Sequence, residues 1–320
     1  MLFRSERIVV AAACTPTASF GSPPFVFCAA RIATNGALDT TFNGNGKVTV
    51  SMAPAYTLSG SLALDGSRVV IAGTCGRMCV VRFNADGSLD TTLNGSGTLV
   101  LGSFAPFDAS SAQAILVDGS GIFLGGSCRD HGDDDFCLVR LTRSGTLDTA
   151  FNGTGRVVTS LGVSPKKDEL TALARHVDGK IVAVGYCNIG TAEYFNDQFC
   201  VAKFNANGSP DTGFNGSGRV FTPLSGISRA AAVVAVGDKT VVAGSCNAGD
   251  ENQYDFCVVR YLASGELDAS FNGNGMTKVD FGGGHDYPTA MVLDGDRILV
   301  SGSCNFSGDR KSTRLNSSHG

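Results

Sequence analysis

The segment Leu38-Asp39-Thr40-Thr41-Phe42-Asn43-Gly44-Asn45-Gly46 decides the fold, because the chain repeats it. The same pattern returns four times, as Leu89–Gly97, Leu147–Gly155, Pro210–Gly218 and Leu267–Gly275. A second segment, which begins with Arg or Lys and ends in Cys, accompanies it at Arg68–Cys75, Lys180–Cys187, Lys239–Cys246 and Arg297–Cys304. Self-similarity at a fixed period indicates a tandem array of one small unit.

Each repeat predicts four short β-strands joined by tight turns. Around Arg68–Cys75, the turn signals Asp65-Gly66-Ser67 and Asn84–Gly87 separate apolar runs, and glycine accepts the positive φ of hairpin turns. Runs such as Val69–Ala72 are apolar at every position, which indicates sheets covered on both faces. We therefore expect an all-β chain, a β-propeller or open arc of four-stranded antiparallel blades, with about five units and partial units at both ends.

Composition agrees with short strands and narrows the range of partners. The chain of 320 residues has 42 glycines, 17% charged residues and a formal net charge of −4. A negative net charge argues against a surface that binds nucleic acid. No apolar run is long enough to span a bilayer as a helix. We expect a single, monomeric repeat array rather than several independent domains.

Both ends of the chain match nothing in the repeat. Asp309–His319 resembles a translated sequencing adapter, and Met1–Ser5 resembles the opposite adapter. Such segments are excluded before a fold is inferred. We therefore expect residues 1–5 and 309–320 to be adapter-derived, and residues 6–308 to be a fragment of a tandem array. Arg4, the apolar run Ile8–Ala13 and Cys14 imitate a short signal peptide or a lipoprotein cleavage site, but Arg7–Cys14 aligns with Arg297–Cys304 and is predicted to be a repeat strand.

Ten of the eleven cysteines form pairs along the sequence. The pairs are Cys14 with Cys28, Cys75 with Cys79, Cys128 with Cys137, Cys187 with Cys200, and Cys246 with Cys257. In each pair the first cysteine ends a predicted second strand and the other begins the third, whereas the loop between them varies in length. The three-residue loop of the tightest pair would set Cys75 directly opposite Cys79, with Cα atoms about 4.5 Å apart.

We expect these pairs to be structural disulfides, with Cys304 left alone because the adapter interrupts its repeat. Unpaired core thiols and metal binding are the alternatives. Zinc needs four converging ligands, whereas these pairs lie on different blades. Several disulfides imply an oxidising compartment. The expected location is therefore extracellular, on the cell surface or periplasmic.

Both halves of the repeat recur in order and in phase. They are clearest in Val177–Val182 followed by Lys203–Gly218, and in Leu64–Val70 followed by Arg82–Gly97. This pattern resembles the delta-60 repeat family of bacterial proteins, over essentially all of residues 6–308. The resemblance implies a propeller-like fold in secreted or cell-surface proteins with no assigned activity, and it supplies no catalytic residues. The paired cysteines are an addition to the family pattern.

One aspartate recurs in every Leu-Asp-Thr-Thr-Phe segment. Its positions are Asp39, Asp90, Asp148, Asp211 and Asp268. Oxygen ligands near glycines suit calcium, but calcium loops need several oxygens at short spacing. The favoured interpretation is an Asx-type turn, in which the carboxylate accepts backbone N–H groups while the following Phe enters the core.

The loops between paired cysteines differ in sequence and are rich in acids. One contains Asp133, Asp134 and Asp135, the next contains Glu193 and Asp197, and the last contains Asp250, Glu251 and Asp255. We expect them to form an acidic rim at one side of the array. Asp133, Asp134 and Asp135 are weak candidates for a calcium site, and the rim could instead bind a basic partner. Solvated loop acids are the plainer alternative.

Support for catalysis in the sequence is thin. His131, His176 and His285 lie in different repeats, and none stands beside a repeated acid or nucleophile. We therefore expect no catalytic residues and no cofactor, apart from the calcium alternative. The predicted function is a non-enzymatic, exported scaffold that presents loops to an unknown protein or surface ligand, or serves as an extracellular spacer. The alternative is a secreted hydrolase or lyase, with its site in the propeller channel or on the loop rim.

Overall fold

A computed structural model describes residues 2–4, 7–14, 26–52, 57–102, 110–130, 133–162, 167–190, 196–224, 226–247, 253–282 and 284–305. They form two compact units. The first is Met1–Ser160 with Lys167–Leu170 and Asn207–Ser209, and the second is Leu161–Lys166, Thr171–Ala206 and Pro210–Gly320. The described residues include no helix able to cross a membrane.

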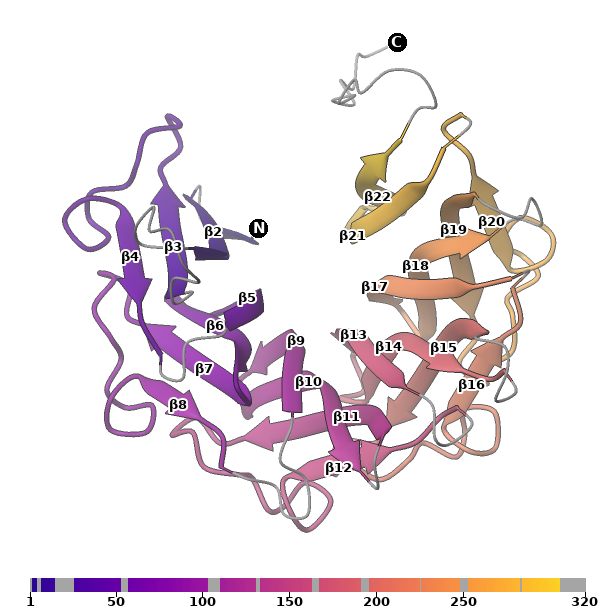
Figure 1. Cartoon of the computed structure of the whole chain (residues 1–320), viewed down its shortest axis with the longest axis horizontal. Helices are drawn as coiled ribbons and strands as arrows, with labels where there is room; N and C mark the ends of the chain where they lie inside the picture. Colours follow the sequence, from indigo (N-terminus) through magenta and orange to yellow (C-terminus); the bar gives the residue numbers. More distant parts are fainter. Residues whose placement is uncertain are drawn as a thin grey trace. The chain divides into compact units, whose positions relative to one another are not determined.

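The first unit contains three sheets of four antiparallel strands, each joined in chain order (Figure 1). The first sheet is β1 (Leu2–Arg4), β2 (Arg7–Cys14), β3 (Val26–Ile32) and β4 (Lys47–Val50). The second is β5 (Thr57–Asp65), β6 (Arg68–Cys75), β7 (Met78–Phe83) and β8 (Thr98–Val100). The third is β9 (Ser110–Asp118), β10 (Gly121–Asp130), β11 (Asp133–Leu141) and β12 (Arg156–Thr159).

The second unit continues the same pattern, with the first residues of β13 assigned to the first unit. The fourth sheet is β13 (Asp168–Arg175), β14 (Ile181–Asn188), β15 (Asp197–Phe204) and β16 (Arg219–Thr222). The fifth is β17 (Ser228–Val236), β18 (Lys239–Asn247), β19 (Tyr254–Tyr261) and β20 (Met276–Val279). Two strands, β21 (Asp286–Asp294) and β22 (Arg297–Cys304), form the last sheet. The prediction of repeated four-stranded antiparallel sheets is confirmed.

The two end sheets differ: the first has four strands, so among the described residues an incomplete sheet is present only at the C-terminal end. The last sheet has two strands among the described residues, and β1 in the first sheet has only three residues. Of the expected adapter segments, Leu2–Arg4 is described as an edge strand paired with β2, with Leu2 opposite Val9. A ladder of backbone hydrogen bonds forms with almost any sequence, so this pairing says nothing of the segment's origin. Residues 309–320 lie outside the described residues.

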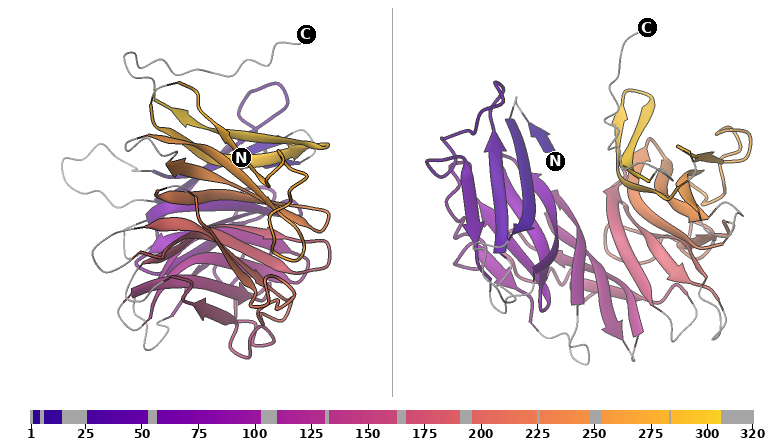
Figure 2. Two further views of the ribbon diagram at one scale, coloured as in Figure 1. Left: turned by 90° about the vertical axis from the view of Figure 1, so that its right-hand side faces the viewer. Right: turned by 45° about the horizontal axis from the view of Figure 1, so that its top comes forward.

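Within each unit, successive sheets pack face to face (Figure 2), and clusters of apolar side chains lie between them. In the first unit, Val70 and Val80 of the second sheet lie in one buried cluster with Leu124 and Val139 of the third. In the second unit, Val241 and Ala243 of β18 pack in a cluster with Met291 of β21. The second and fifth sheets each lie between two others of their own unit and are covered on both faces, as the unbroken apolar runs predict.

A glycine near the end of the second strand permits a bulge in the first strand. The pairing of β9 with β10 shifts register between Gly125 and Gly126, and the pairing of β17 with β18 shifts beside Gly244. A Cβ atom on Gly126 would overlap the carbonyl oxygen of Ser111, because the bulged strand approaches closely there. The Gly-x-Cys ending of the second strand is therefore a packing requirement.

Candidate functional site

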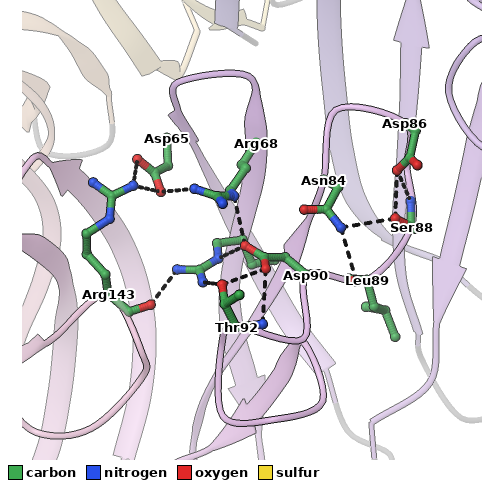
Figure 3. Close-up of polar contacts among 10 residues, drawn as sticks. Asp65, Arg68, Asn84, Asp86, Ser88, Leu89, Asp90, Thr92 and Arg143 are labelled. Carbon is green, nitrogen blue, oxygen red and sulfur yellow. Dashed lines mark hydrogen bonds and ion pairs between the residues drawn. The ribbon is translucent and has the colours of Figure 1, made fainter.

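The repeated aspartate lies at the centre of a hydrogen-bonded cluster, which Figure 3 shows for the second sheet. Asp90 Oδ2 accepts hydrogen bonds from Arg82 Nε at 2.7 Å and from Arg68 Nε at 2.8 Å. Its Oδ1 accepts from the backbone N–H and the hydroxyl of Thr92, at 3.1 and 2.6 Å. Burial acts to raise the pKa of Asp90, but the Thr92 hydrogen bonds and the Arg82 charge hold it below its usual value.

Arg82 also connects two neighbouring sheets. Arg82 donates from one terminal nitrogen to Thr92 Oγ1 at 2.8 Å, and from the other to the carbonyl oxygen of Arg143, in the turn after β11 of the third sheet, at 2.7 Å. The Arg143 side chain returns to the second sheet, where it pairs with Asp65 at 2.6 Å (Figure 3). Arg82 is only 2% exposed. This buried cation is therefore a structural link between blades.

The other repeats place the same groups together. Asp39 pairs with Arg31 at 2.7 Å and bonds Thr41, and Asp268 pairs with Arg260 at 2.7 Å and bonds Ser270. The guanidinium also lies over the phenylalanine of its motif, as in Arg31 over Phe42 at 4.7 Å. Both oxygens of these carboxylates accept from donors of the chain, as the turn interpretation predicts. The sequence reasoning missed the cation, although it precedes the aspartate by eight residues in every repeat.

The asparagine of the Phe-Asn-Gly motif forms a second link between repeats. Asn43, Asn94 and Asn215 have φ of 52°, in the left-handed region that asparagine tolerates better than most residues. Each donates its backbone N–H to a carbonyl in the next repeat: Asn43 to Asp86 at 2.6 Å, Asn94 to Ser144 at 2.8 Å and Asn215 to Ser264 at 2.6 Å. The most repeated residues thus connect blade to blade.

The five cysteine pairs lie at the bases of the variable loops, bonded as disulfides with Cα–Cα distances of 5.3 to 6.1 Å. The expectation that Cys75 would stand directly opposite Cys79 is wrong, because Gly73 occupies that position. Likewise Cys137 is opposite Gly126, and Cys128 is opposite Asp135. The bonded cysteines are diagonal neighbours on one face of the hairpin, a spacing that a disulfide spans. Among the described cysteines, Cys304 is free.

The structure does not bring the predicted calcium candidates together. Asp133, Asp134 and Asp135 are successive residues of β11, so their side chains alternate between the two faces of the strand. Asp134 pairs with Arg129 at 3.4 Å, and Asp135 is buried. Elsewhere on the expected acidic rim, Asp197 pairs with Arg229 and Asp255 with Lys278. Glu193, Asp250, Glu251 and His131 lie outside the described residues.

A pocket of about 200 Å³ in the second unit contains the strongest candidate for acid–base chemistry. It is lined in part by His176, Lys203 and Asp211. His176 Nε2 lies 3.0 Å from Thr240 Oγ1. Burial, followed by the nearby Lys203 charge, lowers the pKa of His176. Burial also lowers the pKa of Lys203.

This pocket marks a departure from the repeat. Lys203 stands where the other repeats have arginine, and Gly213 stands where three of them have threonine or serine and the third repeat has Ala150. Lys203 Nζ lies 3.9 Å from Asp211 Oδ2, a longer contact than those the arginines make. His285, in contrast, stacks with Tyr254 and Tyr287. His176 and His285, the two of these histidines that the structure describes, therefore lie in separate surroundings.

Four segments of the chain match the family model described as "Domain of unknown function (DUF5122) beta-propeller", at residues 63–93, 121–151, 178–214 and 238–271. The chain is built from β-propeller repeats. Each matched segment contains one aspartate and its cation: Asp90 with Arg82, Asp148 with Arg140, Asp211 with Lys203, and Asp268 with Arg260. The residues that define the repeat are therefore those that join its blades.

The β-propeller repeats are also similar to solved structures at low identity. Native arabinanase Arb43A of Bacillus subtilis is 14% identical, with a TM-score of 0.44, over 76% of this chain and 87% of that one. A gluconolactonase of Xanthomonas campestris, XC5397, is 13% identical, with a TM-score of 0.44, over 88% and 79% of the two chains. At these scores and identities, the similarities do not bear on activity. A search of curated proteins finds no match.

Proposed function

We propose that the chain is an exported, non-enzymatic repeat scaffold that presents variable loops to a protein or surface ligand, or serves as an extracellular spacer. The constant base of the loops carries this proposal. The bonded cysteines are separated by 4 to 14 residues in sequence, yet their Cα atoms stay 5.3 to 6.1 Å apart. Binding residues are often located on variable loops whose ends are held in place by a rigid scaffold.

The disulfides also support an extracellular, cell-surface or periplasmic location, because such bonds persist in oxidising compartments. Membership of the bacterial delta-60 family is part of the same proposal. It is supported by the match of four repeats to a β-propeller family model. The clusters around Asp90 and its equivalents contribute to the scaffold, since they connect neighbouring blades.

Loop exchange tests the binding role. The residues between Cys128 and Cys137, and those between Cys246 and Cys257, would each be replaced by Gly-Arg-Met, the natural loop between Cys75 and Cys79. We expect the variant to keep its β-sheet circular dichroism and cooperative melting, but to lose ligands found for the parent on arrays of extracellular glycans and proteins. Unchanged ligand binding by the folded variant would contradict the loop-presenting role.

A secreted hydrolase or lyase is the second candidate, favoured by the pocket around His176. Buried groups with lowered pKa values in a pocket are typical of acid–base sites, and His176 and Lys203 fit that description. His176→Asn and Lys203→Met should then each abolish turnover on a panel of polysaccharide substrates without unfolding the protein. Turnover that survives both substitutions would exclude this pocket as the site.

A further inference from the structure

Three carboxylates converge where the fifth sheet meets the last one. They belong to Asp255 on β19, Asp280 just after β20, and Asp286 at the start of β21, and they are named here the Asp255 cluster. One oxygen of each lies within 4.8 Å of an oxygen of the other two. Asp255 and Asp286 are buried, whereas Asp280 is exposed. The cluster is therefore mostly enclosed and open to solvent through Asp280.

The donors within the described residues do not satisfy this cluster. Lys278 Nζ lies 2.7 Å from Asp255 Oδ2, but Asp255 Oδ1 has no hydrogen-bond partner there, although its residue is only 2% exposed. Asp280 and Asp286 each accept one backbone N–H, from Gly282 and Phe281 respectively, and the Cys304 thiol also hydrogen-bonds Asp286. The three ionised carboxylates and the one ammonium group of Lys278 together carry a net charge of −2. A buried carboxylate oxygen without a donor is costly unless a cation faces it.

The preceding repeat provides an internal comparison. At the equivalent positions it has Gln198, Pro223 and Ser228 in place of Asp255, Asp280 and Asp286. That set is neutral and hydrogen-bonded, with Gln198 Oε1 accepting from Leu224 N at 2.8 Å and from Ser228 Oγ at 3.3 Å. The fold therefore does not require charge at this place. In the Asp255 cluster, carboxylates replace the hydrogen-bonding side chains of the preceding repeat. A bound cation could interact with these carboxylate oxygens in place of the missing donors.

We propose that Asp255, Asp280 and Asp286 bind a calcium ion that joins the fifth sheet to β21. Carboxylate oxygens are the ligands of hard divalent cations, and calcium tolerates the irregular geometry that loop and strand-end ligands provide. The excess of two negative charges matches a divalent ion. The repeated aspartates differ from this cluster, because both carboxylate oxygens of Asp90 and of Asp268 accept from donors of the chain.

Calcium titration of the full chain, freed of metal with chelator, tests the site. We expect saturable heat of binding and a higher melting temperature with calcium chloride. Asp280→Asn should weaken binding at least tenfold while the protein still folds, because Asp280 is exposed. Asp134→Asn is the matched control, since it removes one charge from the other acidic hairpin and should leave calcium affinity unchanged.

A double variant keeps the test independent of folding defects. Asp255→Gln with Asp286→Ser introduces the glutamine and serine of the preceding repeat at the two buried positions, so it should fold and lose the calcium response. Equal calcium affinity in Asp280→Asn and the parent would overturn the proposal. So would the absence of any calcium-dependent heat and melting shift in the folded parent at millimolar calcium.

Discussion

At the residue scale, the aspartate–cation cluster makes the strongest prediction about stability. Asp90→Asn keeps the shape of the side chain but leaves the buried guanidinium of Arg82 without its carboxylate. Breaking one partner of a buried pair should lower the free energy of unfolding by about 3 kcal/mol. Asp148→Asn is the control, because Asp148 and its partner Arg140 are more exposed, and it should cost about 1 kcal/mol or less. Urea unfolding measures both, and equal losses would contradict the role of burial.

His176 makes a prediction about pH. Its pKa is lowered in the folded protein by burial and then by the Lys203 charge, so the unfolded chain binds a proton that the folded chain does not. Stability should therefore fall as pH drops below about 6.5, by up to about 1.4 kcal/mol per pH unit from this group. His176→Asn should show a shallower decline between pH 7.5 and 5.5 in urea unfolding. Parallel pH profiles for the two proteins would refute this assignment.

At the element scale, the bulge beside the Gly-x-Cys ending can be tested with two glycines of one hairpin. A Cβ on Gly126 would overlap the Ser111 carbonyl, whereas a Cβ on Gly119 would meet no atom within 4 Å. Gly126→Ala should lower the free energy of unfolding by about 2 kcal/mol, the usual cost of overpacking. Gly119→Ala should change it by less than about 0.5 kcal/mol. A tolerated Gly126→Ala would show that the first strand can move away from β10.

The same elements show what the sequence could predict. Strands, turns and cysteine pairs were predictable, because turn signals such as Asp65-Gly66 and apolar runs such as Val69–Ala72 act locally and recur. The diagonal register of the cysteines was not, because it depends on how β6 and β7 align beyond the loop. The arginine partners were visible only as a constant spacing, and the Asp255 cluster draws its members from three elements that meet only in the folded chain.

At the scale of the whole molecule, the proposed scaffold depends on the five disulfides that hold the loop bases of the β-propeller repeats. The most direct measurement is a count of free thiols by mass spectrometry, after alkylation of denatured, unreduced protein produced in an oxidising compartment. We predict one free thiol, Cys304, and disulfide-linked peptides that join Cys14 to Cys28, Cys75 to Cys79, Cys128 to Cys137, Cys187 to Cys200, and Cys246 to Cys257. Most of the eleven cysteines found alkylated, or links between different repeats, would contradict this prediction.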